Sequence, residues 1–314
     1  MNHKYTRSGS VLMSFVPLIV LGGLQTFIGF AVSIIYVLAR FSTLPLNDGL
    51  KMFDRNGMLS RLSKEVMNTD FIMIVSCIYA AAGIAVFLAW YLRRIVPAEH
   101  ETIRGRTYPA VPKDAFSLKA GMHPLMIPGL FLLALGLQYM ANYIVMIVTV
   151  INPEIIKSYQ DLMEKSGLES ITITLPLVLY VVILGPICEE LTFRGVTFGY
   201  ISRSLPFWGA NIFQAALFGI MHMNITQGIY AFFLGLFLGE IYYHSGNMLL
   251  NIFLHMGFNA ISLFLSDYLT MGNGTPYVFC LILFVAMCVT YLGRKLTLYV
   301  IDSGKKAKNM AQKN

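Results

Sequence analysis

The stretch TITLPLVLYVVILGPICEELTFRGVTFGYISR, residues 172–203, decides the fold class. Its first part carries no charge as far as Cys188, and a helix needs about 20 apolar residues to cross a bilayer. Two adjacent carboxylates, Glu189 and Glu190, follow, and the sequence then continues with few charges to Arg203. At 1.5 Å per residue, a helix through this stretch places Glu189 about 21 Å from its far end, inside the hydrocarbon layer.

The rest of the chain has the same apolar character. Of its 314 residues, 56% are hydrophobic and only 12% are charged, against roughly 25% charged in an ordinary soluble protein. So few charged side chains cannot cover a water-facing surface. The composition therefore excludes a disordered chain, a collagen-like fibre and a soluble nucleic-acid-binding protein, and it indicates an integral membrane protein.

Apolar segments of membrane-spanning length recur along the chain. They predict an all-α fold, a polytopic membrane helix bundle with about eight transmembrane helices. The segments between 172 and 266 are so closely spaced that one of them could be re-entrant. We expect an N-terminal membrane region with two transmembrane helices and loops at 1–121, a core at 122–293 and a basic cytoplasmic tail at 294–314. The candidate spans are 12–39, 71–92, 122–151, 172–190, 206–222, 226–244, 247–266 and 276–293.

The basic residues orient this bundle. With eight spans both termini share one side, which carries fifteen Lys and Arg residues against seven on the other. The positive-inside rule therefore predicts a multi-pass protein of the cell membrane with both termini in the cytoplasm. The short loops are typical of a prokaryotic plasma membrane. Topology alone explains the net charge of +7, although the basic loop at 93–119 could also contact anionic membrane lipids; nucleic acid is not an expected partner.

Ionisable residues inside apolar sequence need a reason, because a charge at the bilayer centre costs roughly 2.5–3.5 kcal/mol on insertion scales. Arg194 follows Glu190 by four residues, so both lie on one helix face and Arg194 can hold Glu190 ionised. Glu189 points about 100° away and is free for proton transfer. Pro186 removes a backbone hydrogen bond and kinks or opens the helix there. The alternative is a helix end at the interface with an ordinary surface Glu–Arg pair.

Two further segments carry polar groups at matching depth. His222 ends the segment that begins near Pro206. The chain reverses direction between Arg203 and Pro206, so we expect His222 and Glu189 at similar depth. His255 and Asn259 share one face of an apolar helix. Glu189 with His222 could serve as general base and proton shuttle, and His255 with Asn259 could donate hydrogen bonds to an oxyanion. The alternatives are an interfacial histidine and a His–Asn pair that only joins helices.

The other polar and sulfur groups have structural interpretations. Glu240 and His244 are also four residues apart, but they sit at a segment end and predict an interfacial pair. The four cysteines lie in or at the edge of apolar runs without CxxC spacing, which is typical of buried hydrophobic residues.

Three motifs occur in order on these segments: EExxxR at Glu189, Glu190 and Arg194, FxxxH at Phe218 and His222, and HxxxN at His255 and Asn259. In this order and spacing, residues 170–265 resemble the CAAX prenyl endoprotease and bacteriocin-processing (CPBP, or Abi) family of intramembrane proteases. The resemblance implies a helical bundle around a polar cavity and makes 122–293 a membrane protease core. It also implies a catalytic set: Glu189, Glu190, Arg194, His222, His255 and Asn259.

Within this resemblance, Glu189 with His222 would activate the hydrolytic water, Glu190 with Arg194 would support them, and His255 with Asn259 would form the oxyanion site. No cofactor is required, although two Glu and two His could also bind a divalent metal such as zinc. The absence of HExxH disfavours a metalloprotease of the site-2 type.

The family resemblance predicts an intramembrane endopeptidase acting on a hydrophobic or lipidated peptide or protein, such as a pheromone or bacteriocin precursor. A second hypothesis is a non-enzymatic membrane protein for self-immunity or for a signalling partner, with the same polar residues as a binding site. An ion or solute transporter would need carboxylates too, but it predicts inverted repeats, and the two halves of the chain show none.

Overall fold

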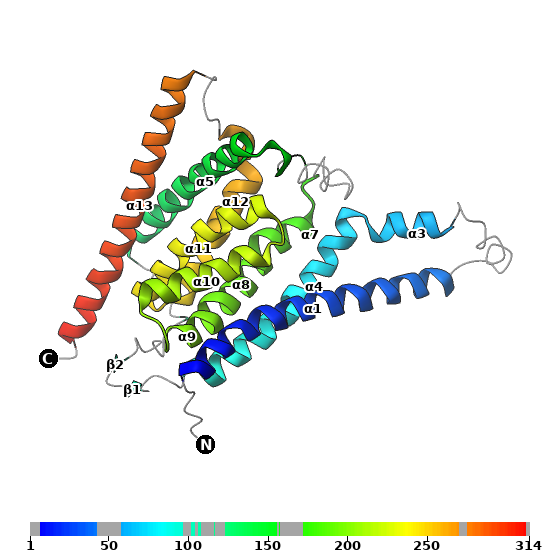
Figure 1. Ribbon diagram of the computed structural model, residues 1–314, viewed down its shortest axis with the longest axis horizontal. Helices are drawn as coiled ribbons and strands as arrows, with labels where there is room; N and C mark the ends of the chain where they lie inside the picture. Colours follow the sequence, from blue (N-terminus) through cyan, green and yellow to red (C-terminus); the bar gives the residue numbers. More distant parts are fainter. Residues whose placement is uncertain are drawn as a thin grey trace.

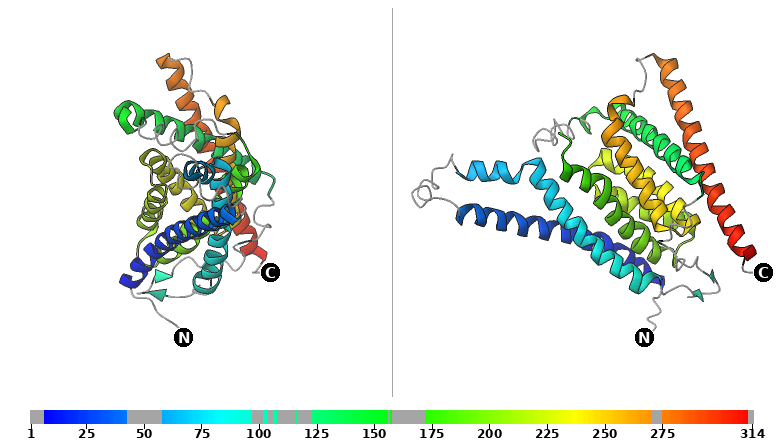
Figure 2. Two further views of the ribbon diagram at one scale, coloured as in Figure 1. Left: turned by 90° about the vertical axis from the view of Figure 1, so that its right-hand side faces the viewer. Right: turned by 180° about the vertical axis from the view of Figure 1, so that it is seen from behind.

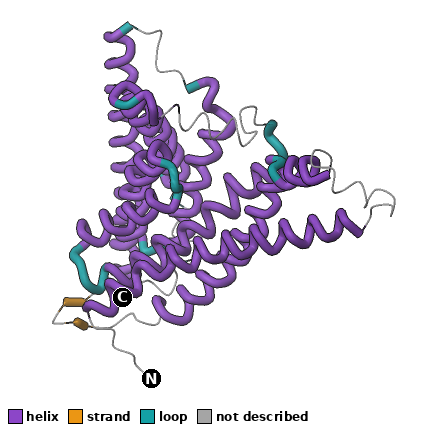
Figure 3. The backbone as a smooth tube through the Cα atoms, turned by 45° about the vertical axis from the view of Figure 1, so that its right-hand side comes forward, coloured by secondary structure: helices purple, strands orange, loops and turns teal. Residues whose placement is uncertain are grey.

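The computed structural model describes residues 7–42, 58–96, 102–103, 106–107, 116, 123–155, 157, 172–269 and 275–311. These residues form a bundle of long helices with one small antiparallel hairpin at its edge (Figures 1 and 3). The boundary predicted between residues 121 and 122 lies outside the described residues. The strands are β1 (Thr102–Ile103) and β2 (Arg106–Thr107).

Each predicted apolar segment forms a helix, and the all-α membrane bundle is confirmed. Asparagine side chains begin three of these helices by accepting backbone N–H bonds, at Asn68, Asn224 and Asn247. The long elements are α1 (Arg7–Ser42), α4 (Thr69–Trp90), α5 (Met126–Ile151), α10 (Phe207–Met221), α11 (Ile225–Ser245), α12 (Met248–Leu265) and α13 (Pro276–Ala311). A short helix, α3 (Met58–Val66), precedes α4.

Seven helical stretches in the described residues are long and apolar enough to cross a membrane, one fewer than predicted. The exception is α10, which at 15 residues is about 22 Å long. Its chain still runs across the bundle and returns through α11. The first turn of α1 and the last turn of α13 therefore lie at the same end of the molecule (Figures 1 and 2).

The bundle has a lipid-facing periphery and a buried centre. Of the seven spanning stretches, α1 buries the smallest share of its side chains and α11 the largest. On α1, Leu12, Ile19 and Phe27 are each at least 70% exposed, as expected for side chains that meet lipid. The two motif-bearing spans, Leu175–Ile201 and Met248–Tyr268, are each 44% buried and belong with α11 to the enclosed centre.

The predicted tail is part of the bundle. Helix α13 continues without a break past Gly293 to Ala311, so the boundary expected at 293/294 falls inside a helix. Thr297 and Val300 beyond that point are buried. Gly293 allows the close approach, because an added Cβ would lie 2.8 Å from the carbonyl carbon of Leu132 on α5.

Within residues 172–203, the chain forms one continuous helix from Leu175 to Ile201. It widens twice into π-helix, at η5 (Leu179–Leu184) and η6 (Leu191–Thr197), on either side of α8 (Gly185–Glu190). The Gly185 N–H bonds to the carbonyl of Tyr180, five residues back, immediately before Pro186. The helix is thus opened at Pro186, as predicted, and single π turns of this kind are frequent at functional sites. Its ends are α7 (Leu175–Val178) and α9 (Phe198–Ile201).

Candidate active site

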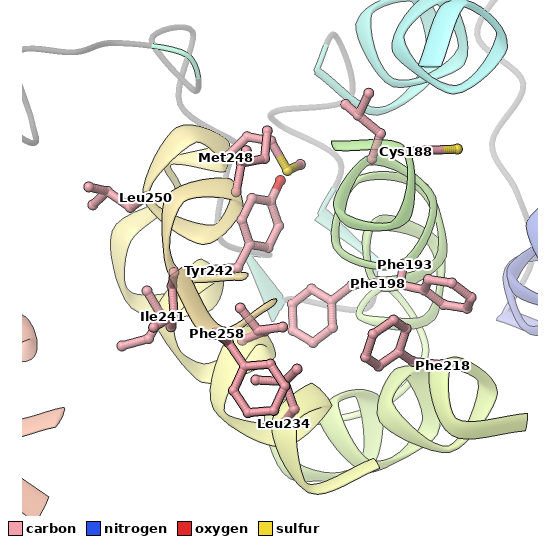
Figure 4. Close-up of a cluster of buried hydrophobic side chains, with 14 of the residues drawn as sticks. Cys188, Phe193, Phe198, Phe218, Leu234, Ile241, Tyr242, Met248, Leu250 and Phe258 are labelled. Carbon is pink, nitrogen blue, oxygen red and sulfur yellow. The ribbon is translucent and has the colours of Figure 1, made fainter. Parts of the chain in front are cut away.

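Both adjacent glutamates lie near the middle of this continuous helix. Glu190 is fully buried, whereas the side chain of Glu189 is 13% exposed and lines a cavity. Beside them, Phe193 and Phe218 pack edge to face with ring centroids 5.2 Å apart (Figure 4). The interpretation as a helix end with a surface Glu–Arg pair is therefore wrong, because the helix continues and the pair is enclosed.

Glu190 is held by three side chains. Arg194 Nη1 donates to Oε1 over 2.8 Å, and Asn251 Nδ2 donates to Oε2 over 3.1 Å. His255 Nδ1 lies 2.8 Å from Oε1. The Arg194 guanidinium also stacks 4.4 Å from the centroid of Phe218. All three partners are buried, so Glu190 joins α8, η6 and α12 in one polar network.

Asn251 is the member of this network that the sequence interpretation missed. Its Nδ2 also donates to the Leu238 carbonyl on α11 over 2.7 Å. The signal was available: Asn251, His255 and Asn259 follow one another at intervals of four and therefore share one face of α12. A single helix face thus supplies three polar groups.

The bond to Glu190 fixes the orientation of His255. A carboxylate paired with arginine only accepts hydrogen bonds, so His255 Nδ1 must be the donor. Its Nε2 then faces Glu189, 3.6 Å from Oε2. This distance exceeds a direct hydrogen bond and leaves His255 between the two carboxylates.

One polar cavity brings the remaining predicted residues together. It has a volume of about 600 Å³. His222 Nδ1 donates to the Phe218 carbonyl over 2.9 Å, so Nε2 is the ring nitrogen that remains for proton transfer. Asn259 Nδ2 donates to the Val181 carbonyl over 2.8 Å, and its second amide hydrogen remains. Of the predicted set, Glu189, His222, His255 and Asn259 line the cavity, whereas Glu190 and Arg194 lie behind it.

Glu240 has a different partner from the one predicted. It forms an ion pair with Arg294 on α13, whose Nε donates to Oε2 over 2.7 Å. His244 instead contacts the rings of Phe207 and Tyr243. Glu240 therefore joins α11 to α13 and does not belong to the polar cavity.

The four candidate zinc ligands do not form a metal-binding set. Within the described part of the chain, no group of three or more His, Cys, Asp or Glu side chains is arranged to hold a metal ion. Glu190 already accepts bonds at both oxygens.

Comparison with known proteins gives one match. Residues 171–261 match the family model Rce1-like, described as type II CAAX prenyl endopeptidase Rce1-like. Neither the curated proteins nor the solved structures give a significant match. The matched segment begins before α7, ends in α12 and contains all three motifs. It confirms the resemblance of this segment to the CAAX protease family.

Proposed function

We propose that this protein is an intramembrane endopeptidase that hydrolyses a peptide bond with water activated by Glu189 and His222. The observation that carries the proposal is the shared cavity: Glu189, His222, His255 and Asn259 all line it, within the segment that matches the protease family. Three other cavities among the described residues, of about 450, 480 and 390 Å³, have neither a carboxylate nor an imidazole in their lining.

In the proposed reaction, the Glu189 carboxylate takes a proton from water, and the resulting hydroxide adds to the scissile carbonyl carbon. The carbonyl oxygen becomes an oxyanion, to which Asn259 donates its second amide hydrogen. His255 donates to it from Nε2 in its doubly protonated form, since Nδ1 already donates to Glu190. His222 assists proton transfer to the leaving amine, and the C–N bond breaks as the carbonyl re-forms. The products are a carboxylate and a protonated amine. One proton of the water reaches the amine nitrogen through Glu189 and His222, and the second is transferred when the new carboxyl group ionises.

Glu190 and Arg194 act in this proposal as positioning residues. Both side chains are 0% exposed, so neither meets the substrate. Glu190 fixes the His255 ring through Nδ1, which directs Nε2 toward Glu189 and the cavity. Arg194 keeps Glu190 ionised, and an ionised Glu190 can only accept the His255 proton donor.

A neighbouring apolar cavity of about 450 Å³ supports a hydrophobic or lipidated peptide substrate. It lies among α5, α11, α12 and α13 and shares Tyr230, Leu234 and Phe258 with the polar cavity. An apolar group of the substrate would fit there while the scissile bond lies near Glu189. The cytoplasmic placement of both termini and a prokaryotic cell membrane are part of the same proposal.

The test is cleavage of a fluorogenic library of hydrophobic peptides by purified protein in lipid nanodiscs. The arms are wild type, Glu189→Gln, chelator-treated wild type and the control Glu154→Gln. Glu154 is exposed in a helical turn that follows α5, so this control makes the same chemical change outside the cavity. We expect Glu189→Gln to lower turnover by about 10²–10⁴-fold, the usual contribution of general acid–base catalysis, and Glu154→Gln to leave it unchanged.

The other outcomes separate the alternatives. Loss of turnover on chelation would establish a metal-dependent reaction and contradict the mechanism. Full turnover in Glu189→Gln would reject Glu189 as the base. A wild-type protein that cleaves no peptide but binds one through the cavity would favour the immunity or signalling function.

A further inference from the structure

A second polar cavity lies where α1, α4 and α9 meet. It is on the opposite side of the bundle from the apolar cavity among α5, α11, α12 and α13. Its volume is about 390 Å³. None of its residues belongs to the proposed catalytic machinery or to the matched family motifs. It is lined by Met13, Ala89, Trp90, Arg93, Arg94 and Tyr200.

The cavity is strongly cationic. Arg93 and Arg94 are exposed, and in the described part of the chain neither has a carboxylate within ion-pair distance. Arg203 is buried and does not line the cavity; its guanidinium lies 5.1 Å above the Tyr200 ring, and its Nη2 donates to the Arg94 carbonyl over 3.4 Å. An arginine side chain offers several N–H donors in a planar fork that matches the oxygens of a phosphate group.

The cavity also has an amphipathic wall. Trp90 Nε1 donates to the Tyr200 hydroxyl over 3.0 Å, so these two polar groups lie beside the indole and phenol rings that carry them. On α1 the neighbouring Leu12 is 70% exposed, and Val86 on α4 is 39% exposed. A ligand with a charged head and apolar chains would meet the arginines with its head and these side chains with its tails.

The position of the cavity matches a membrane–water interface. Arg93 and Arg94 lie at the end of the Thr69–Ile95 span, Tyr200 at the end of the Leu175–Ile201 span and Met13 near the start of the Ser8–Arg40 span. These span ends lie together at the end of the molecule where α1 begins and α13 ends (Figures 1 and 2). Basic pockets between membrane helices at such an interface bind the headgroups of anionic lipids.

We propose that this cavity binds the phosphate headgroup of an anionic phospholipid whose acyl chains lie along α1 and α4. Arg93 and Arg94 contact the phosphate, and Trp90 forms the interfacial wall, with the buried Tyr200 behind it. The assignment is independent of the proposed protease reaction, because it involves none of that site's residues.

The chain has two tryptophans, which makes a direct test available. Trp208 is 64% exposed, and Trp208→Phe leaves Trp90 as the only tryptophan, inside the cavity. This protein is reconstituted in phosphatidylcholine vesicles that contain brominated phosphatidylglycerol or, in the matched arm, brominated phosphatidylcholine. Quenching of Trp90 fluorescence as a function of lipid fraction gives the relative association constant of the two lipids. Inorganic phosphate is added in a separate arm.

We expect phosphatidylglycerol to be preferred over phosphatidylcholine, and the double variant Arg93→Gln/Arg94→Gln to lower this preference by about 30-fold. Lys305→Gln/Lys306→Gln removes two exposed charges from α13 at the same end of the molecule and should keep the preference. Ala89→Leu fills the cavity without changing charge and should abolish it. Size-exclusion elution identifies any variant that fails to fold.

Three results would overturn the proposal. The first is an unchanged preference in the Arg93→Gln/Arg94→Gln protein. The second is an equal loss in the Lys305→Gln/Lys306→Gln protein, which would indicate general surface charge. The third is relief of quenching by inorganic phosphate, which would assign the cavity to free phosphate.

Discussion

Two glutamate–arginine pairs in this molecule have the same length and opposite surroundings. The shortest N–O distance is 2.8 Å both in Glu190–Arg194 and in Glu65–Arg40. The first pair is 0% exposed at both side chains, whereas Glu65 is 34% and Arg40 51% exposed. The Glu240–Arg294 pair lies between these extremes, at 10% and 31% exposure.

The difference shows that distance alone does not define the role of an ion pair. Glu65 also accepts a bond from Tyr36 over 2.9 Å, and these bonds join α3 to α1. Glu190 orients His255 at the proposed site. Solvent reaches neither charge of the Glu190–Arg194 pair. Burial makes each member of the inner pair dependent on the other.

The largest expected effect comes from Arg194→Met. Removing the cation leaves Glu190 buried without a countercharge, which should lower the free energy of unfolding by about 3–5 kcal/mol. Equilibrium unfolding in mixed micelles measures this loss. The double variant Arg194→Met/Glu190→Leu should recover part of it, since no uncompensated charge remains. An Arg194→Met protein as stable as wild type would break the comparison.

A second effect concerns the neutral partner of the same network. Asn251→Leu leaves Glu190 Oε2 and the Leu238 carbonyl without their donor, and it should cost about 1.5–3 kcal/mol of unfolding free energy. The control is Asn142→Leu, a half-buried amide on α5 that accepts one side-chain bond, from Gln138 Nε2 at 3.3 Å. Equal losses in the same unfolding assay would show that the network around Glu190 has no special dependence on burial.

The intermediate pair should give an intermediate result. Glu240→Gln keeps one acceptor for Arg294, whose side chain reaches the surface, so we expect a loss of about 1 kcal/mol. The unfolding assay used for Arg194→Met measures it on the same scale. A loss as large as that of Arg194→Met would mean that exposure does not order these three pairs.

The exposed Glu65–Arg40 pair should affect stability in a way that depends on pH. The hydrogen bond from Arg40, joined by one from Tyr36, lowers the pKa of Glu65 below its usual value. A lowered folded-state pKa stabilises the α1–α3 contact above the unfolded pKa, and the contribution disappears as pH falls through the folded pKa. Thermal unfolding of wild type and Glu65→Gln should therefore differ slightly at neutral pH and converge in acid. A difference that grows in acid would contradict the assigned sign.

Contacts within one helix could be predicted from the sequence, and contacts between helices could not. The Glu190–Arg194 pair follows from a spacing of four on a continuous helix. Glu240 and Arg294 are 54 positions apart, and no periodicity states which faces of α11 and α13 meet. The sequence therefore predicts the nearer His244 as the partner of Glu240, and this prediction is wrong.

The helix count shows a related limit. Hydropathy identified every apolar segment, including 206–222, but it does not decide where a helix ends. Pro206 begins α10 and a turn with a positive φ at Met223 ends it, which leaves the helix shorter than a full span. Likewise, the sequence placed Glu189 and His222 at similar depth, but only the folded helices show that both line one cavity.

The shortness of α10 has a mechanical consequence for the surrounding bilayer. A hydrocarbon layer is about 30 Å thick, and α10 covers about 22 Å of it. Lipids accommodate a short apolar segment by thinning locally. His222 caps this helix, so a bilayer that thins around α10 would bring water toward the place where the proposed reaction needs it. The protein's shape would then hydrate the site by bending the membrane rather than by opening a channel.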